Sequence, residues 1–515
     1  MSHWIGSALE KLPVGPLSGI VRSRRRPMRT QRRLLRSLLR RAADTERGRR
    51  YDFARLAEAD DAVRAYQETV PLSGYDDLRP EAERLRDGDA ENVIWPGGCT
   101  HFAVSSGTVS EGKIIPVSDA MLARDRSFSV GVGMNYLAET GDLGLLGGPL
   151  LSLPGAVTED RRPGTLVGEV SGLLAARKPA FIRWGYEAVP PSVWKMEDWD
   201  DKLRAVVDRT LERDVRTLVM APTWGLVLFR LLIDRFNEKH DTNATTVGEV
   251  WPNLRLFISG GVALSSYREM LADLIGLPDQ MHFLETYGAS EGFFALQDDL
   301  GDPAMLVHAD NGVFYEFVPV DDYGASDPTR LTLGEVETGQ RYALHVSTCS
   351  GLWAYDVGDV VRFTQTDPPR IKVAGRTSSM LDGYGEAVFA EEAREALRRA
   401  CREAGGAVRD FHVAPVESGN LPAHQWLVEF EQAPTDRDHF AGVIDRYLQD
   451  VNRHYQIRRD ARAFGPPEIE ALPEGTFRRW LDATNERVSA QTKVPRLSEA
   501  RTVADHILRI VGNNA

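Results

Sequence analysis

The chain of 515 residues is too long for one ordinary hydrophobic core, so two or three domains are expected. Its apolar content of 42% and its charged content of 27% are typical of a globular protein and exclude a largely disordered chain. The net charge is −13. The three widely spaced cysteines, Cys99, Cys349 and Cys401, argue against a disulfide framework and against a zinc site.

Residues 28–70 have the apolar periodicity of helices. Thirteen arginines lie between Arg22 and Arg50 against two acids, and leucines recur within this run at helical spacing at positions 34, 35, 38 and 39. A basic surface for nucleic acid or for an anionic membrane is one interpretation. We favour a helix with a buried leucine face and a solvated arginine face, because the rest of the chain is strongly acidic.

From about residue 90, short apolar runs end in Gly, Ser or Pro, and helical stretches at 199–213 and 264–276 lie between some of them. This alternation predicts an α/β architecture in which ligands bind beyond the carboxyl ends of the strands. Residues 218–233 predict a buried strand, a loop at APTWG and a core helix, and they fall short of a membrane span. The runs predicted as strands are NVIWP (92–96), HFAVSS (101–106), RTLVMAP (216–222), LRLFISGG (254–261) and MHFLETYG (281–288).

From about residue 305 the pattern predicts an antiparallel sheet or a small barrel. Its runs are AMLVH (304–308), GVFYEFVPV (312–320), LTLGEVETG (331–339), RYALHVST (341–348) and VVRF (360–363). After a boundary near 370–380, helices over 387–404 and 436–454 and paired strands in FHVAPVE (411–417) and QWLVEFE (425–431) predict a compact α+β unit. The expected domains are therefore 1–372 and 373–515.

Two glycine-containing stretches follow predicted strands. VSSGTVSEGK, 104–113, offers three hydroxyls, Gly107 and a later lysine, which suits a phosphate-binding loop without the Walker A spacing. FISGGVAL, 257–264, runs from a strand into Gly260 and Gly261, which suits a backbone platform for a flat base. Plain turns are the alternative interpretation of both stretches.

YGASEG, 287–292, contains a G-x-S-x-G from Gly288 to Gly292 centred on Ser290. A nucleophile elbow needs a helix directly after the serine, and the residues that follow, GFFALQDDLGDP, are a poor helix start. An oxyanion segment of the HGGG type is also missing from the sequence upstream. We therefore favour a polar turn that presents Glu291 over a serine nucleophile.

Two later residues are candidates for nucleotide chemistry. Asp359, in YDVGDVVRF (355–363), is either the cap of a turn or an acceptor for two ribose hydroxyls. Lys493, in AQTKVPRL (490–497), precedes Pro495 and is expected in an extended segment, where the alternative is a solvated surface charge.

In this order the motifs resemble those of adenylate-forming enzymes. The closer resemblance is to the GH3 family of acyl acid–amido synthetases, known from plant auxin and jasmonate conjugation and present in bacteria, and the chain is identified as a bacterial member. The resemblance extends from about residue 30 to 500. It rests on SSGT (105–108), ISGG (258–261), TYGASEGFFALQ (286–297), GVFYEFVP (312–319), YDVGDVVRF (355–363) and KVPR (493–496).

The resemblance implies a large N-terminal α/β domain with a β-rich subdomain and a small mobile α+β C-terminal domain. It implies that ATP and Mg²⁺ activate a carboxylic acid as an acyl-adenylate, which an amine, often an amino acid, then attacks. The implied site consists of a catalytic lysine (Lys493), a metal ligand (Glu291) and nucleotide contacts at Ser105, Ser106, Gly107, Thr108, Gly260, Gly261, Tyr287, Gly288, Ser290, Asp359 and Arg376.

The acyl pocket is expected between the strand ends and the core helices, with Trp224 and Phe294 in its wall or, alternatively, as plain core aromatics. Two departures from the family pattern stand out. Val109 replaces a hydroxyl after SSGT and SEGK comes one residue early, and Asp356 stands where many relatives have arginine. The first departure affects the expected geometry of triphosphate binding. The second matters less, because Asp359 itself is present.

Three rival functions remain open: transfer of the acyl group to the thiol of CoA or a carrier protein, a serine hydrolase using Ser290, and a non-catalytic nucleotide-binding protein. The partners expected are a small carboxylic acid and an amine, with no nucleic acid and no membrane, and the protein is expected to be a monomer. The cysteine usage and the absence of an apolar leader predict a cytoplasmic location.

Overall fold

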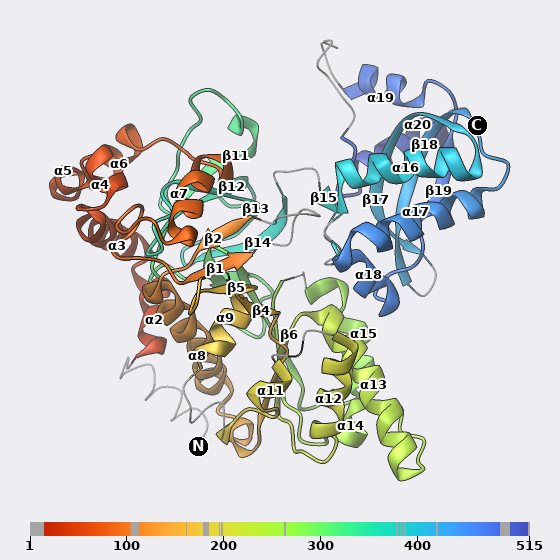
Figure 1. The fold of residues 1–515 in the computed structure, drawn as a ribbon, viewed down its shortest axis with the longest axis horizontal. Helices are drawn as coiled ribbons and strands as arrows, with labels where there is room; N and C mark the ends of the chain where they lie inside the picture. The colour runs from red at the N-terminus through yellow and green to blue at the C-terminus, as the bar shows by residue number, and fades with distance from the viewer. Residues whose placement is uncertain are drawn as a thin grey trace. The chain divides into compact units, whose positions relative to one another are not determined.

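The computed structural model describes residues 15–104, 113–160, 162–178, 185–194, 196, 199–261, 264–376, 380–381, 383–384, 386, 388–418, 421–484 and 495–512. These residues form two compact units (Figure 1). The first unit extends to Ala374, and the second begins at Gly375. Each unit is described by itself.

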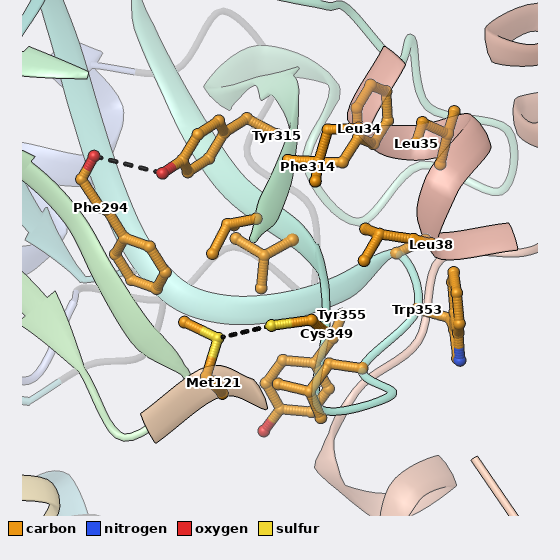
Figure 2. Packing of buried hydrophobic residues seen from close by; sticks show 14 of the residues in the cluster. Leu34, Leu35, Leu38, Met121, Phe294, Phe314, Tyr315, Cys349, Trp353 and Tyr355 are labelled. Carbon is orange, nitrogen blue, oxygen red and sulfur yellow. Dashed lines mark hydrogen bonds between the residues drawn. The ribbon is translucent and has the colours of Figure 1, made fainter. Parts of the chain in front are cut away.

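In the part of the first unit that the structure describes, six helices precede the first strand. Proline at the first position of α2 and of α3 has the backbone dihedral of a helix and lacks only a hydrogen bond that a helix start does not need. The predicted leucine face is confirmed, since Leu34, Leu35 and Leu38 are buried in the same hydrophobic cluster as Phe314 and Trp353 (Figure 2). The helices are α2 (Pro16–Arg25), α3 (Pro27–Ala42), α4 (Glu46–Arg50), α5 (Phe53–Glu58), α6 (Ala62–Thr69) and α7 (Tyr75–Asp87).

The arginines of this region do not all face solvent. Arg24 donates to Asp298 at 2.6 Å, and the Asp298 carboxylate, fully buried, also pairs with Arg370. Arg22 donates to Asp310 at 2.5 Å. A buried carboxylate needs such partners because it has lost its hydration. Part of the basic run therefore neutralises acids inside the first unit, which sequence reasoning did not anticipate.

A ten-stranded sheet runs through the first unit in the order β11-β12-β13-β14-β10-β9-β8-β7-β6-β3. Its parallel half confirms the predicted α/β texture. This half contains β3 (Leu150–Ser152), β6 (Thr217–Met220), β7 (Leu256–Ser259) and β8 (His282–Ala289). The helices between β3 and β8 are α9 (Val170–Ala176), α11 (Pro191–Trp194), α12 (Trp199–Thr210), α13 (Pro222–His240), α14 (Val247–Val250) and α15 (Arg268–Ile275).

The other half of the sheet contains the predicted antiparallel runs as an extension of the parallel strands rather than as a separate barrel. Its strands are β9 (Gly292–Leu296), β10 (Met305–Val307), β11 (Val313–Pro319), β12 (Arg341–Thr348), β13 (Tyr355–Thr366) and β14 (Pro369–Arg376). The long helix α8 (Asp119–Thr140) contacts β9. A smaller sheet contains β1 (His101–Val104), β2 (Ile114–Pro116), β4 (Val157–Glu159) and β5 (Leu166–Gly168).

Three local predictions differ from the structure. NVIWP is a loop rather than a strand, because Asn92 has a positive φ of 54° and its side chain accepts a bond from the Gly97 amide at 2.8 Å. LTLGEVETG is mostly turns, with a single bridge from Leu331 to Phe317. The loop expected at APTWG is absent, because α13 begins at Pro222 directly after β6.

The second unit has the predicted α+β composition. Its sheet has the order β17-β18-β19, with β17 (Ala407–Ser418) antiparallel to β18 (Leu421–Gln432) and β18 parallel to β19 (Glu468–Leu472). A short pair, β15 (Met380–Leu381) and β16 (Val388–Phe389), precedes it. The helices are α16 (Ala390–Ala404), α17 (Arg437–Val451), α18 (Arg453–Asp460), α19 (Thr476–Thr484) and α20 (Thr502–Gly512).

Within the described ranges, no helix combines the length and the apolar character that crossing a bilayer requires.

His308 makes stability depend on pH. It follows β10, is buried against α2 and Phe128, and burial lowers its pKa from 6.5 to about 4. Between these values the unfolded chain binds a proton that the folded protein does not, so the free energy of unfolding falls as pH drops. We expect His308→Gln to remove about 2–3 kcal/mol of the fall between pH 7 and 4.5. Urea unfolding of both proteins measures it, and equal falls would contradict the assignment.

Candidate functional site

YGASEG forms a β-hairpin. Strands β8 and β9 are antiparallel, Ala289 pairs with Gly292, and only Ser290 and Glu291 lie between them. Two-residue connections are the common hairpin turn. A nucleophile elbow requires a helix after the serine. Since strand β9 occupies that position, the elbow interpretation of Ser290 is wrong.

This hairpin lies where the sheet changes character. β8 is parallel to β7 on one side and antiparallel to β9 on the other. The carboxyl ends of β6, β7 and β8 therefore share one edge of the sheet, where α/β folds bind their ligands. Gly260 and Gly261 follow β7 at this edge.

The glycines at this edge have structural reasons to be glycine. Gly261 has φ +88°, a conformation that other residues rarely adopt. A Cβ at Gly260 would lie 3.0 Å from Thr286 Oγ1, and that hydroxyl donates to the Ser259 carbonyl at 2.8 Å. At Gly288 a Cβ would meet the Phe293 ring at 2.3 Å. The close approach of backbone and side chains agrees with a base platform and equally with tight strand packing.

Tyr287 and Asp359 connect two of the sequence motifs. The Tyr287 hydroxyl donates to Asp359 Oδ2 at 2.6 Å, although the residues are 72 positions apart in the chain. Each residue is 7% exposed, so the contact is largely shielded from water. A hydrogen bond to a carboxylate in such a place is strong and directional. The fold therefore brings YGASEG and YDVGD together, as the sequence analysis expected for one nucleotide site.

Glu291 lies beside the same strand. Its side chain is 5% exposed. Burial raises the pKa of Tyr355, at the start of β13, well above its usual range, and the negative charge of Glu291 raises it further. Glu291 and Asp359 thus both lie near β13. Sequence reasoning missed Tyr355 as a neighbour of Glu291, although it opens the YDVGD motif.

Glu291 fits the chemistry of a Mg²⁺ ligand. Mg²⁺ is commonly held by one or two carboxylates together with substrate phosphates and waters. Within the described ranges, no group of three or more acidic, histidine or cysteine side chains could hold a metal ion by itself. A single carboxylate that shares the ion with a nucleotide is consistent with this arrangement.

The two aromatic candidates lie in different places. Trp224 is half-buried in the first turn of α13, at the carboxyl edge beyond β6. Phe294 is 1% exposed and packs edge-on to Tyr287, with ring centroids 5.2 Å apart. Figure 2 shows Phe294 in the hydrophobic cluster, where its carbonyl accepts from Tyr315. Packing behind Tyr287 is the role that this position supports.

Several predicted site residues lie outside the described residues: Ser105, Ser106, Gly107, Thr108 and Lys493. Their flanks are described. β1 and β2 pair on either side of the first segment, with Val104 opposite Ile114. After Lys493, Pro495 accepts from His412 Nδ1 at 2.6 Å and Arg496 accepts from the Val413 amide at 2.9 Å. Arg376 is described only as the last residue of β14.

Comparison with known families and proteins gives a consistent result. The GH3 family N-terminal, central and C-terminal domains match residues 17–205, 306–376 and 391–502, which together cover more than half of the chain. Indole-3-acetic acid-amido synthetase GH3.3 of Arabidopsis thaliana is 23% identical, with 92% of each chain covered. Jasmonoyl--L-amino acid synthetase GH3.5 of Oryza sativa subsp. japonica is 22% identical, with 81% of this chain and 83% of the relative covered.

Solved structures share the fold. GH3.15 acyl acid amido synthetase superposes with a TM-score of 0.60 at 18% identity, covering 97% of both chains. A 2-hydroxyisobutyryl-CoA ligase in complex with 2-HIB-AMP and CoA superposes with a TM-score of 0.53 at 13% identity, covering 96% of this chain and 94% of the other. The predicted fold class, that of the adenylate-forming enzymes, is thereby confirmed. With all three of its domains matched in order, the chain belongs to the GH3 family.

Proposed function

We propose that the protein is an ATP-dependent ligase that joins a carboxylic acid to an amine, an amino acid, through an acyl-adenylate. One observation carries the proposal: the Tyr287–Asp359 hydrogen bond unites the two motifs that the family resemblance assigns to one nucleotide. Plant relatives of similar length named as amido synthetases support the amine as acceptor.

Each described residue has a specific task in this proposal. A carboxylate can accept several hydrogen bonds, so Asp359 can hold the ribose hydroxyls while it accepts from Tyr287. Tyr287 then offers its ring to the adenine beside Gly260 and Gly261. Glu291 would hold Mg²⁺, which would supply charge neutralisation at the phosphates. Ser105, Ser106 and Thr108 hold phosphate oxygens.

The reaction divides into two balanced steps. A carboxylate oxygen of the acid attacks the α-phosphorus of ATP, and the bond to pyrophosphate breaks. The amine nitrogen then attacks the acyl carbon, AMP leaves, and the amine loses a proton. Lys493 is proposed to reach the α-phosphate in the first step, where a positioned cation stabilises the added negative charge. The second unit is proposed as the lid that protects the adenylate from water.

Pyrophosphate release tests the proposed function. Purified protein with ATP, Mg²⁺ and a library of carboxylic acids is assayed with each amino acid and, separately, with CoA. Amine-dependent turnover, with the amide detected by mass spectrometry, supports the proposal. Lys493→Ala is expected to lose adenylate formation. If release required CoA and ignored every amine, the acceptor would be a thiol, an outcome that the shared fold of the CoA ligase makes worth including.

Trp224 is proposed to form part of the acyl pocket. Its half-buried ring at the start of α13 offers an apolar wall where ligands bind in such sheets. We expect Trp224→Ala to raise the KM for the preferred acid about 10-fold and to leave the KM for ATP within about twofold, since one aromatic contact contributes roughly 0.5–1.5 kcal/mol beyond the area it buries. Steady-state kinetics with varied acid and ATP measure both. A larger change in the KM for ATP than in the KM for the acid would mean that Trp224 does not line the acyl pocket.

A further inference from the structure

Helix α8 presses one face onto the first residues of β9. Met121, Asp125 and Phe128 lie on that face at helical spacing. Gly292 has a φ of +147°, a conformation that other residues rarely adopt, and a Cβ there would also lie 2.3 Å from Met121 Cε, so α8 packs closely against this glycine. The Phe128 ring stacks on Phe293, with centroids 5.1 Å apart and planes 12° apart.

Asp125 adds directional contacts between these two apolar ones. Its Oδ1 accepts from the Phe293 amide at 3.2 Å and from Asn311 Nδ2 at 3.1 Å. The same Asn311 nitrogen donates to the Phe293 carbonyl at 2.9 Å. One carboxyl oxygen and one amide group thus hold both backbone polar groups of Phe293, two residues after Glu291.

This arrangement is costly to stability. Asp125 is fully buried, its Oδ2 has no hydrogen-bond partner among the described residues, and burial raises its pKa to about 7. A buried carboxyl with an unsatisfied oxygen destabilises the fold. Burial raises the pKa of Cys349 and of Tyr315, and the negative charge of Asp125 raises both further. Neither of these two neighbours is a cation that could neutralise that charge. Residues that break packing rules in this way concentrate where function needs a fixed geometry.

We propose that Asp125, with Asn311, is a positioning residue that fixes the Ser290–Glu291 turn so that the Glu291 carboxylate meets the metal–nucleotide. The inference rests on the proposed function, because it assigns Glu291 to the metal. Asp125 itself touches neither substrate nor metal in this proposal. It acts through the backbone of Phe293. Replacing Asp125 should therefore change the Mg²⁺ concentration that the reaction requires.

Three variants and a control test the proposal. Asp125→Ala removes the acceptor, Asn311→Ala removes the amide bridge and leaves Asp125 in place, and Asp125→Asn keeps an oxygen that accepts the same two bonds. Ser129→Ala is the matched control, because Ser129 lies on the same helix and donates only to the Asp125 carbonyl at 2.9 Å. Folding of each variant is verified by thermal unfolding.

The readout is the Mg²⁺ concentration at half-maximal pyrophosphate release, with hydrogen exchange of the peptide Tyr287–Leu296 as a second measurement. We expect a rise of about 10-fold or more and faster exchange in Asp125→Ala and Asn311→Ala, a value within threefold of the parent for Asp125→Asn, and no change for Ser129→Ala. In a Glu291→Gln background, Asp125→Ala should add nothing.

The outcomes separate the two claims. A parent protein that is active but whose Mg²⁺ dependence is unmoved by Asp125→Ala and Asn311→Ala overturns the inference and leaves the proposed function standing. So does an equal additional loss in the Glu291→Gln background. If the parent protein releases no pyrophosphate with any acid, both the proposed function and the inference are wrong. An Asp125→Ala protein that fails to fold leaves the decision to Asn311→Ala.

Discussion

Glu291→Gln is expected to lower the Mg²⁺-dependent rate of adenylate formation by about 10²–10³-fold, while Ser290→Ala leaves it within about threefold. The two residues form the turn of one hairpin, Glu291 buried and Ser290 partly buried, so a change that only disturbs the turn should affect both variants. Glutamine keeps the shape of the side chain and removes its charge. Losing one ligand to a catalytic metal removes several kcal/mol of charge stabilisation in the transition state.

The measurement is pyrophosphate release at saturating acid with Mg²⁺ varied. Ser290→Ala serves as the control for disturbance of the turn, and unfolding of both variants is compared with the parent. A comparable loss of rate in Ser290→Ala would indicate that the serine takes part in the reaction. Labelling of the parent by a fluorophosphonate probe, abolished in Ser290→Ala, would indicate the same. Restored turnover of Glu291→Gln at high Mn²⁺ would further identify the defect as metal binding.

Breaking the Tyr287–Asp359 contact is expected to weaken ATP binding. Asp359→Asn should raise the KM for ATP about 30-fold, because hydrogen bonds to a buried charged group contribute roughly 1.5–3 kcal/mol. Tyr287→Phe should raise it about fivefold, since its ring remains and only the 2.6 Å hydrogen bond is lost. The double variant should be close to Asp359→Asn alone, because the hydroxyl acts through the carboxylate.

Steady-state kinetics with ATP varied, or equilibrium binding of ATP, measure these changes. Tyr342→Phe is the matched control: Tyr342 is 3% exposed, and its hydroxyl accepts from a backbone amide, that of Glu337, at 3.0 Å. Strict additivity of Tyr287→Phe and Asp359→Asn would mean that the two side chains act independently. An unchanged ATP constant in Asp359→Asn would remove that residue from the ribose site.

The sequence predicted best where the signal was local. The leucine spacing in residues 28–42 predicted the buried face of α3, because helical periodicity depends only on neighbours in the chain. The prediction of a strand at NVIWP was wrong for the converse reason. Val93, Ile94 and Trp95 are buried, yet Asn92 and Gly97 close a loop through two hydrogen bonds, one of them to the Asn92 side chain. Apolar character reports burial, and it does not by itself report a strand.

The candidate site divides in the same way. Residue types suggested Glu291 and Asp359, since carboxylates suit a metal and a sugar ring, and the family resemblance added Tyr287 for the base. Asp125 and Asn311 carry no motif. Their contacts to Phe293 join positions 168 and 18 residues apart, so only the folded chain shows them. The basic N-terminal run is a similar case, because the pairing of Arg24 with Asp298 spans 274 residues.

YGASEG shows the division most clearly. The sequence by itself determined the family resemblance, the α/β class and the preference for Glu291, because composition and spacing limit which chemistry a segment can supply. Only the tertiary structure decided that β9 follows the turn as a strand and that Tyr287 meets Asp359 on β13. The physical reason is that strand pairing and buried hydrogen bonds are contacts between distant segments, whose free energy no single segment contains.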